Sequence, residues 1–576
     1  MNYSDRWHRY RDVVFTICLL LVIGLIVWFR GFLHPARIIP PNESYGELFY
    51  NAVNSDALFG KDALFADEKA FLDATPRLSN EQVRAAFLHE VRSKSPQALR
   101  GFVLEHFLIT EQHTHTADTT SHYLPIRLRI RDLWGVLRRY PTHSEVQGTH
   151  IPLSKPYTVP GGRFREMYYW DSYFTILGLL VDGYTTDARH MLDNFATLLQ
   201  QYGFIPNGTR TYYGTRSQPP FFSHMVEALV LATRDSTLLD TYASALRTEY
   251  DFWMRGHTML TRYTPAVLRT IRMADGEILN RYYDNAAIPR AENYRADYAA
   301  GQLWSQRHGG ANATSFYRHL RASSESGWDN ASRWLINLTD PLTINTTNIV
   351  PVDLNALLYH AEQLLATMYR YLNQPVEAER FVALAEARRR AIHKYFWQPH
   401  VGYFVDVTRA PHKPTGVYTT AGLMPLFVGL ATQRQAARVA DFVRQNLLHA
   451  GGLACSAHTT GYKWDAPTGS APGQWIAYVG FRRSGQCALA DDVSHRWRKL
   501  VATHYYRTHE LYDRYNVVND APLAGEYTTQ LGFGWTNAVF QLFEHYHFYP
   551  QVCPISSPDY LRTTDERNSA SNTYTP

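Results

Sequence analysis

Amphipathic helical patterning recurs along most of this chain and limits the folds open to it. Apolar residues return at intervals of three and four, as at Leu354, Leu357, Leu358, Leu364 and Leu365, which is the spacing of one helix face. The pattern predicts helices over residues 80–92, 127–139, 187–201, 222–234, 238–255, 354–372, 376–396, 433–448, 488–508 and 537–546. Strand-like alternation is scarce. We therefore predict an all-α fold with one large helical domain at residues 46–550.

An uncharged apolar stretch occupies residues 13–29, near the start of the chain. It is just long enough to cross a bilayer as a helix, and Arg6, Arg9 and Arg11 precede it. No small-x-small cleavage site follows, which favours a retained signal anchor over a cleaved signal peptide. We predict a cytoplasmic segment at 1–12, one N-terminal transmembrane helix at 13–29 and an exported body anchored to the inner membrane. The alternative is a buried helix of a soluble core.

Composition describes the ends of the body and excludes some classes of function. Residues 30–45 contain prolines without periodicity and predict a linker, and residues 551–576, rich in Ser, Thr and Asn, predict a disordered tail. A net charge of +5 from 57 basic and 52 acidic residues provides no basic stripe for nucleic acid. Neither the four cysteines nor the 25 histidines show metal-ligand spacing. We expect buried thiols or at most one disulfide, no metal and no cofactor.

One dense loop, PGGRFREMYYWDSY at residues 160–173, combines two glycines, an arginine and a Trp-Asp pair. Gly161 and Gly162 permit a tight turn. Arg163 and Asp171 could form bidentate hydrogen bonds to adjacent sugar hydroxyls while Trp170 packs on the ring face. The structural alternative is that Asp171 caps a helix and Trp170 belongs to the core.

This loop closely resembles a signature of the trehalase family of glycoside hydrolases, and further runs resemble that family in the same order. They are IPNG at 205–208, RSQPPFF at 216–222, PRAENY at 289–294, ESGWD at 325–329, ELYD at 510–513, GEY at 525–527 and GFGWTN at 532–537. The resemblance implies an (α/α)6 toroid with long active-site loops at one end. It also implies hydrolysis of α,α-trehalose to two glucose molecules with inversion of the anomeric configuration.

An inverting mechanism needs one carboxyl group to protonate the bridging oxygen and another to activate water, roughly 6.5–9.5 Å apart. The resemblance assigns the acid to Asp329 and the base to Glu510. Trp328 offers an apolar wall that favours the protonated acid, although Asp329 could instead cap a helix that begins at Asn330. The residues alone do not rank Glu510 above the carboxyl groups near it in sequence, and Glu526 is the second candidate base.

The resemblance also implies a set of groups that hold the two glucosyl rings. The set comprises Arg163, Trp170, Asp171, Asn207, Arg216, Gln218, Arg290, Glu292, Glu526 and the Gly327 backbone. Three arginines exceed the needs of a neutral sugar, so we expect their charge to offset the carboxylates and help keep Glu510 ionised. Arg210 and Arg333 are interpreted instead as ion-pairing residues of the structure.

Two loops depart from the family pattern. Where the family has a Gln before the Trp-Asp pair and Asn-Gly-Trp after it, this chain has Lys463 and then Thr468, Gly469 and Ser470, and the glycine-rich run before GEY is reduced. The loss of a stacking Trp leaves open an inverting exo-glycosidase that acts on another α-glucoside. The alternative of another class is a non-catalytic, membrane-tethered sugar-binding protein.

The glycosylation triplets bear on the compartment. Those at Asn207 and Asn330 fall inside the motifs above, where a glycan would block the site, and are interpreted as chance matches. This favours a bacterial periplasm. We expect a monomer whose partners are trehalose and, through its N-terminal helix, the membrane.

Overall fold

The computed structural model describes residues 37–60, 63–91, 95–109, 124–141, 148–519, 521–523, 528–548 and 553–554. The expected cytoplasmic segment at 1–12 and the expected anchor at 13–29 lie outside these ranges. Among the helices that the structure does describe, none is both long enough and apolar enough to span a membrane. The expected tail at 551–576 also lies outside the described residues, apart from Cys553 and Pro554.

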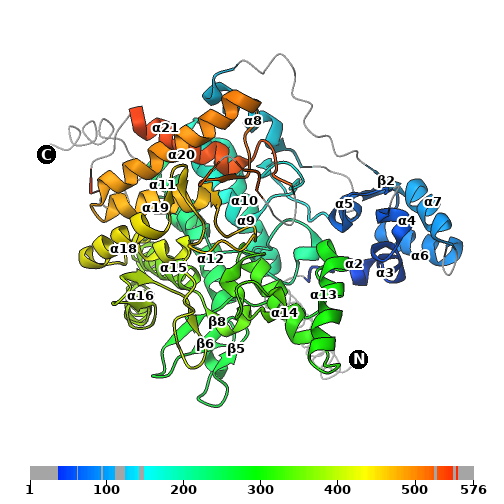
Figure 1. Cartoon of the computed structure of the whole chain (residues 1–576), viewed down its shortest axis with the longest axis horizontal. Helices are drawn as coiled ribbons and strands as arrows, with labels where there is room; N and C mark the ends of the chain where they lie inside the picture. Colours follow the sequence, from blue (N-terminus) through cyan, green and yellow to red (C-terminus); the bar gives the residue numbers. More distant parts are fainter. Residues whose placement is uncertain are drawn as a thin grey trace, which may run out of the picture.

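An inner ring of helices forms the centre of the molecule (Figure 1). Its members are α9 (Tyr169–Val181), α11 (Phe222–Thr233), α15 (Val352–Tyr371), α17 (Met424–Phe427), α19 (Ala471–Arg483) and α21 (Gly534–Phe548). Each contacts the next along the chain, and α21 contacts α9, so the ring is closed. Most side chains of α9 and α15 are buried, because these helices are covered on nearly all sides.

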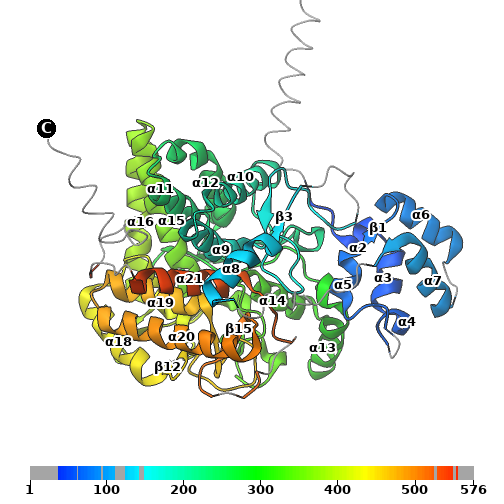
Figure 2. The same cartoon turned by 90° about the horizontal axis from the view of Figure 1, so that it is seen from above.

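A second set of helices surrounds the ring and alternates with it along the sequence (Figure 2). These outer helices are α8 (Ile126–Leu137), α10 (Thr185–Tyr202), α12 (Leu238–Met254), α16 (Pro375–Tyr395), α18 (Gln433–Asn446) and α20 (Cys487–Thr508). They are amphipathic: α18 buries Ala436, Val439 and Val443 along one face, while its polar side meets water. The described helices thus form the predicted (α/α)6 toroid.

The strands are short and lie in the connections, as the scarcity of alternation predicts. The antiparallel pairs are β1 (Thr75–Pro76) with β2 (Phe107–Leu108), β3 (Arg138–Arg139) with β4 (Tyr157–Thr158), β8 (Ile349–Val350) with β11 (Val407–Thr408), β9 (Trp397–Gln398) with β10 (Tyr403–Phe404), β12 (Leu448–His449) with β13 (Gly452–Leu453), and β14 (Thr468–Ser470) with β15 (Arg514–Asn516). The connection between α12 and α15 holds the sheet β5 (Ala266–Val267), β6 (Thr270–Arg272) and β7 (Ile278–Asn280), followed by α13 (Tyr294–Arg307) and α14 (Thr314–Glu325).

The first helices form a separate N-terminal lobe, residues 41–108, which projects from the toroid (Figure 1). Its helices are α2 (Pro41–Ser44), α3 (Glu47–Val53), α4 (Asp56–Phe59), α5 (Glu68–Asp73), α6 (Asn80–Glu90) and α7 (Pro96–His106). They enclose a second hydrophobic core, to which Tyr45 contributes and which Tyr168, Tyr212 and Tyr213 of the toroid's loops complete. Ile38 is buried as well, so the last part of the expected linker at 30–45 packs against the protein.

One disulfide joins Cys487, the first residue of α20, to Cys553 beyond α21. Cys455 is a free and buried thiol. This agrees with the expectation of buried thiols or at most one bridge.

The closure of the ring predicts a packing effect at Gly178. A Cβ at this position of α9 would lie 2.7 Å from Cα and Cβ of Ala538 in α21. We expect Gly178→Ala to lower the free energy of unfolding by roughly 1–3 kcal/mol, the usual cost of overpacking a core. Gly135→Ala in α8 is the control, because nothing lies within 4 Å of its Cβ position, and it should stabilise by about 0.5–1 kcal/mol. Calorimetry of both variants checks this, and equal shifts in the two melting temperatures would contradict it.

Candidate active site

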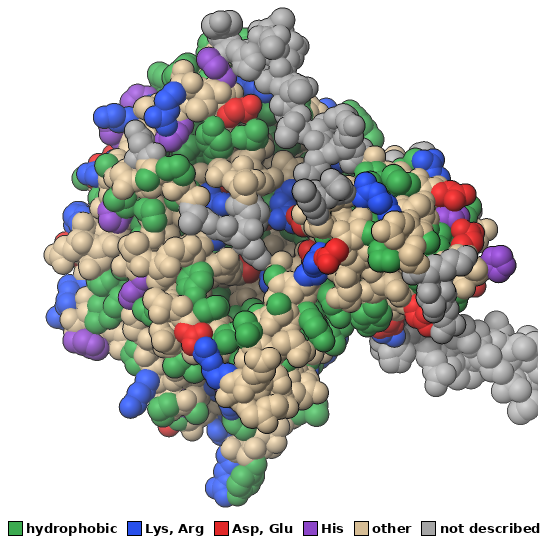
Figure 3. Space-filling model, turned by 45° about the vertical axis from the view of Figure 1, so that its right-hand side comes forward, with side chains coloured by type: hydrophobic (Ala, Val, Ile, Leu, Met, Phe, Trp, Pro, Cys, Tyr) green, Lys and Arg blue, Asp and Glu red, His purple; other side chains and the backbone are tan. Residues whose placement is uncertain are grey.

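A cavity opens where the loops at one end of the ring meet the N-terminal lobe, and Figure 3 shows the surface hollowed at the centre of this face. It holds about 980 Å³ of space free of protein atoms, part of it open to solvent. Its wall includes Asp329 and every predicted substrate-binding residue that the structure describes: Arg163, Trp170, Asp171, Asn207, Arg216, Gln218, Arg290, Glu292 and Gly327.

The first turn of α9 presents Trp170 and Asp171 to the cavity. The chain reaches this turn through Gly162, whose φ is 56° and whose Cβ position lies 2.3 Å from Oε1 of Gln530. Only glycine fits both the conformation and the space. The backbone N–H of Trp170 donates to Oε1 of Gln218 at 3.0 Å, so two predicted binding residues hold each other in place.

Asp171 is buried and is not the helix cap of the structural alternative, because the N-cap of α9 is Tyr168. Burial raises the pKa of the Asp171 carboxyl to about 7. Its own backbone N–H and the charge of Lys463 lower this pKa, whereas the charges of Asp329 and Asp513 raise it. A carboxyl group that titrates near neutrality inside a cavity is typical of a functional site.

Asp329 lies in the loop that follows α14. At Gly327 the φ is 71°, and a Cβ there would lie 2.9 Å from the ring of Trp170, so the backbone passes directly over the indole. Within the described part of the chain no helix begins at Asn330, which has a left-handed φ of 59°. The next helical turn starts at Ser332. The helix-cap interpretation of Asp329 is therefore wrong.

Indole rings line the cavity beside Asp329. Trp328 stacks on Trp464 with centroids 5.0 Å apart, and Trp170 lies 5.8 Å from Trp464 and 5.7 Å from Trp535. Trp170 belongs both to the hydrophobic core and to the cavity wall. Such rings offer flat apolar surface of the kind that packs against the C–H face of a sugar.

Asp465, the residue after Trp464, ties two loops together. Its buried carboxylate accepts the backbone N–H of Ser332 at 3.0 Å, the Ser332 hydroxyl at 2.9 Å and the Ser456 hydroxyl at 2.7 Å. The backbone N–H of Trp464 donates to the carbonyl of Asn330 at 3.3 Å. The loop that carries Asp329 is thus held by the loop at 456–468.

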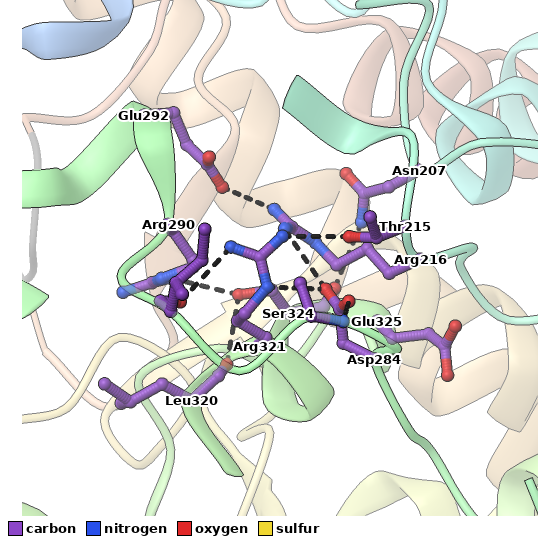
Figure 4. A network of polar contacts seen from close by, with 12 residues as sticks. Asn207, Thr215, Arg216, Asp284, Arg290, Glu292, Leu320, Arg321, Ser324 and Glu325 are labelled. Atoms are coloured by element: carbon purple, nitrogen blue, oxygen red, sulfur yellow. Dashed lines mark hydrogen bonds and ion pairs between the residues drawn. The ribbon is translucent and has the colours of Figure 1, made fainter. Parts of the chain in front are cut away.

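Arg216 has hydrogen-bonding capacity left over inside the cavity wall. It is 1% exposed, forms an ion pair with Glu292 and lies 3.7 Å from Asp284 (Figure 4). Among the described residues, its Nε and Nη1 and Oε2 of Glu292 have no hydrogen-bond partner. Buried polar groups of this kind are normally satisfied, so donors and an acceptor stand ready for a ligand.

The other two wall arginines have carboxylate partners as well. Arg290 forms a bidentate pair with Asp297 at 2.7 and 2.9 Å and donates to the Ser324 hydroxyl at 3.0 Å. Arg163 pairs with Asp67 of the N-terminal lobe at 2.6 Å. These pairs orient the guanidinium groups and offset their charge within the wall itself.

Glu510 is not part of the cavity wall among the residues that the structure describes. It follows α20, and its backbone N–H donates to Oγ1 of Thr508 at 3.3 Å. Asp513, in the same motif, is fully buried and accepts the backbone N–H of Gln530 at 2.9 Å. Burial raises the pKa of Asp513. Glu526 lies outside the described residues.

Several residues of the wall were not predicted to bind substrate, among them Asp67, Lys69, Lys463, Trp464 and Trp535. Lys463 and Trp464 belong to a loop that the sequence marks as a departure from its family, which is the signal that could have identified them. The two lobe residues have no such local signal, because only docking of the lobe brings them to the site.

Arg210 and Arg333 are structural ion-pairing residues, as expected. Arg333 is fully buried and binds Asp353 at 2.8 Å and Asp406 at 2.7 Å. Arg210 lies 3.5 Å from Glu166. Neither arginine lines the cavity in the described structure.

A closed helical toroid with an indole-lined, carboxyl-bearing cavity is typical of a carbohydrate-active enzyme. Comparison with known proteins narrows this class. The model of the trehalase family matches residues 63–547. The chain is 42% identical over 510 residues to a periplasmic trehalase of Pseudomonas aeruginosa, covering 87% of this chain and 90% of that protein. It is 38% identical over 506 residues to a periplasmic trehalase of Escherichia coli (strain UTI89 / UPEC), covering 87% and 86%.

A solved structure shares the fold. The neutral trehalase of Saccharomyces cerevisiae superposes with a TM-score of 0.56 at 24% identity, covering 77% of this chain and 86% of that one. The chain belongs to the trehalase family.

The geometry at Gly327 predicts an effect on activity. Gly327→Ala places a methyl group 2.9 Å from the Trp170 ring at a left-handed φ, so the loop that carries Asp329 must move. We expect at least a tenfold loss of kcat/KM toward trehalose, because small misplacements of reacting groups are costly. Gly309→Ala, at a φ of 65° with nothing within 4 Å, bears the same backbone strain and should keep its activity. Comparable losses in both variants would show that backbone strain alone is responsible.

Proposed function

We propose that this protein is an α,α-trehalase that hydrolyses trehalose to two molecules of glucose outside the cytoplasm. Its family and the names of relatives at 42% and 38% identity support the proposal. The observation that carries it is the position of Asp329, a carboxyl group that shares a cavity wall with three indole rings and with the described residues predicted to bind substrate.

The wall provides complementary groups for a neutral disaccharide. Trp170 offers a ring face, while Nε of Arg216 and Oε2 of Glu292 offer a donor and an acceptor without partners among the described residues. Asp171, which is buried in the same cavity wall, can accept hydrogen bonds from sugar hydroxyl groups when ionised. The wall arginines serve chiefly through directed N–H groups, since carboxylates of the wall offset their charge.

The proposed reaction inverts the anomeric carbon. Asp329 gives its proton to the bridging oxygen as the glycosidic bond breaks, and Glu510 takes a proton from the water that attacks the opposite face. One glucose leaves with the bridging oxygen in its hydroxyl group, and the other gains its hydroxyl oxygen from water. The assignment of Glu510 rests on the ELYD motif, with Glu526 as the second candidate and Asp513 as a third carboxyl group nearby.

The cellular arrangement is part of the proposal. An anchor at residues 13–29 would hold a monomeric catalytic body at the inner membrane, on the periplasmic side. The Cys487–Cys553 disulfide supports an exported body, because disulfides persist in oxidising compartments and are rare in the cytosol.

The departure at 468–470 is a weaker argument for another α-glucoside than the sequence suggests. These residues form β14, which pairs with β15, and they do not line the main cavity within the described structure. Ser470 borders a smaller hollow behind Trp170 and Trp464. The change therefore lies behind the indole wall, so contact with the second glucose depends on other residues.

Hydrolysis and its stereochemistry are tested together. A soluble protein that begins at residue 37 should release glucose from trehalose much faster than from maltose or kojibiose. Early proton NMR spectra should show one β-glucose for each α-glucose. Faster turnover of maltose or kojibiose would favour the other exo-glycosidase, and two α-glucoses would show retention.

Chemical rescue separates the two catalytic roles. Asp329→Asn should lose at least 10³-fold in kcat on trehalose but much less on α-glucosyl fluoride, whose leaving group needs no proton. Glu510→Gln should lose activity on both substrates and regain part of it with azide, which attacks without a general base. Asp513→Asn is the matched control for a neighbouring carboxyl group. Azide rescue of Asp513→Asn but not of Glu510→Gln would move the base to Asp513.

A further inference from the structure

A buried lysine lies in the cavity wall. Lys463 is 7% exposed, and its Nζ lies 5.5 Å from the centroid of the Trp464 ring. The backbone beside it is fixed, because the N–H of Trp464 donates to the carbonyl of Asn330 and Asp465 is fully buried. The segment that carries the lysine is therefore held in the wall.

A buried ammonium ion is costly unless negative charge compensates it. Asp171 of α9 and Asp329 of the loop after α14 line the same cavity as Lys463, and Asp513 is fully buried in the segment after α20. The charge of Lys463 lowers the pKa of both Asp171 and Asp513. Asp513 has a second cation, since Arg514 pairs with it at 2.8 Å.

The ionisation of Asp171 depends on Lys463 more strongly than that of Asp513 does. Of the charges that act on the Asp171 carboxyl, that of Lys463 has the largest effect. The remaining cations of the wall have other carboxylate partners, in the pairs Arg163–Asp67, Arg216–Glu292, Arg290–Asp297 and Lys69–Glu166. The negative charges of Asp329 and Asp513 act in the opposite direction on Asp171.

We propose that Lys463 is a positioning residue of the substrate site, whose buried ammonium group keeps Asp171 ionised among neighbouring carboxyl groups so that Asp171 accepts hydrogen bonds from the sugar hydroxyl groups. The proposal rests on the proposed trehalase function. It gives the lysine a role that a neutral amide at this position could not fill.

The direction of the pH dependence follows. The Asp171 carboxyl has a pKa of about 7 in the protein, so it is ionised above neutral pH and protonated below. Loss of a nearby positive charge raises the pKa of a carboxyl group further. Without Lys463, the pH below which Asp171 is protonated and trehalose binding weakens should move upward.

The experiment measures KM and kcat for trehalose from pH 5.5 to 9 in the wild type, Lys463→Gln and Lys463→Arg. In the wild type KM should rise as the pH falls through about 7. In Lys463→Gln this rise should begin about one pH unit higher, which makes KM roughly fivefold larger at pH 7, about tenfold larger well below pH 7 and nearly normal at pH 9. Lys463→Arg should restore most of the wild-type profile, and kcat should change much less than KM.

The control is Lys394→Gln. Lys394 also lies over an aromatic ring, with its Nζ 4.8 Å from the centroid of Tyr395, but it is not part of the cavity wall in the described structure. Its replacement should leave the pH profile of KM unchanged.

Asp171→Asn provides a second test that does not require Lys463→Gln to fold. If Lys463 acts through Asp171, Asp171→Asn loses the pH-dependent rise of KM, and the double variant Asp171→Asn/Lys463→Gln binds trehalose like the single Asp171→Asn variant. A rise of KM that persists in Asp171→Asn, or a Lys463→Gln effect equal at every pH, would overturn the role of Lys463. Absence of trehalose turnover in the wild type would instead overturn the proposed function.

Discussion

The contact between α9 and α21 is the constraint on which the site depends. These helices lie far apart in the sequence, and their packing at Gly178 and Ala538 closes the inner ring. Closure places the loop before α9 against the segment before α21, where the N–H of Gly534 donates to the carbonyl of Pro160 at 2.7 Å. The N–H of Arg163 donates to the side chain of Gln530 at 2.8 Å. One wall of the cavity is therefore a consequence of closing the ring.

Charge compensation explains how so many ionised groups share this wall. A buried ion without a partner is strongly destabilising. Here the guanidinium of Arg290 donates to both carboxylate oxygens of Asp297, and Arg216 forms an ion pair with Glu292. Such pairs leave little net charge for a neutral sugar to meet and keep each donor in a fixed direction. Asp171 is different, because burial raises its pKa to about 7 and none of the described residues forms a direct ion pair with it.

The sequence predicted the outer helices well because their burial is one-sided. The amphipathic α18 lies at 433–446 against a predicted 433–448, since one apolar face leaves a period of three and four. The inner α19, at Ala471–Arg483, was not predicted: nearly every residue in it is buried, so no polar face marks its period. Motif residues such as Arg216 and Asp171 were found in the wall, whereas Asp67 was not, because its place depends on how the lobe docks.

The N-terminal lobe contributes charged side chains to the wall of the substrate cavity. Lys69 of α5 is 3% exposed and lies 3.0 Å from Glu166, which is fully buried in the loop before α9. Lys69 also pairs with Asp73 at 2.6 Å, and Glu166 also lies 3.5 Å from Arg210, so the contact joins buried charges of the lobe to buried charges of the toroid. The same contact holds Asp67 beside Arg163 at the cavity. The substrate cavity therefore lies where two hydrophobic cores meet, and the orientation of Arg163 is coupled to the packing of the lobe, whose core includes Tyr168, Tyr212 and Tyr213 of the toroid's loops.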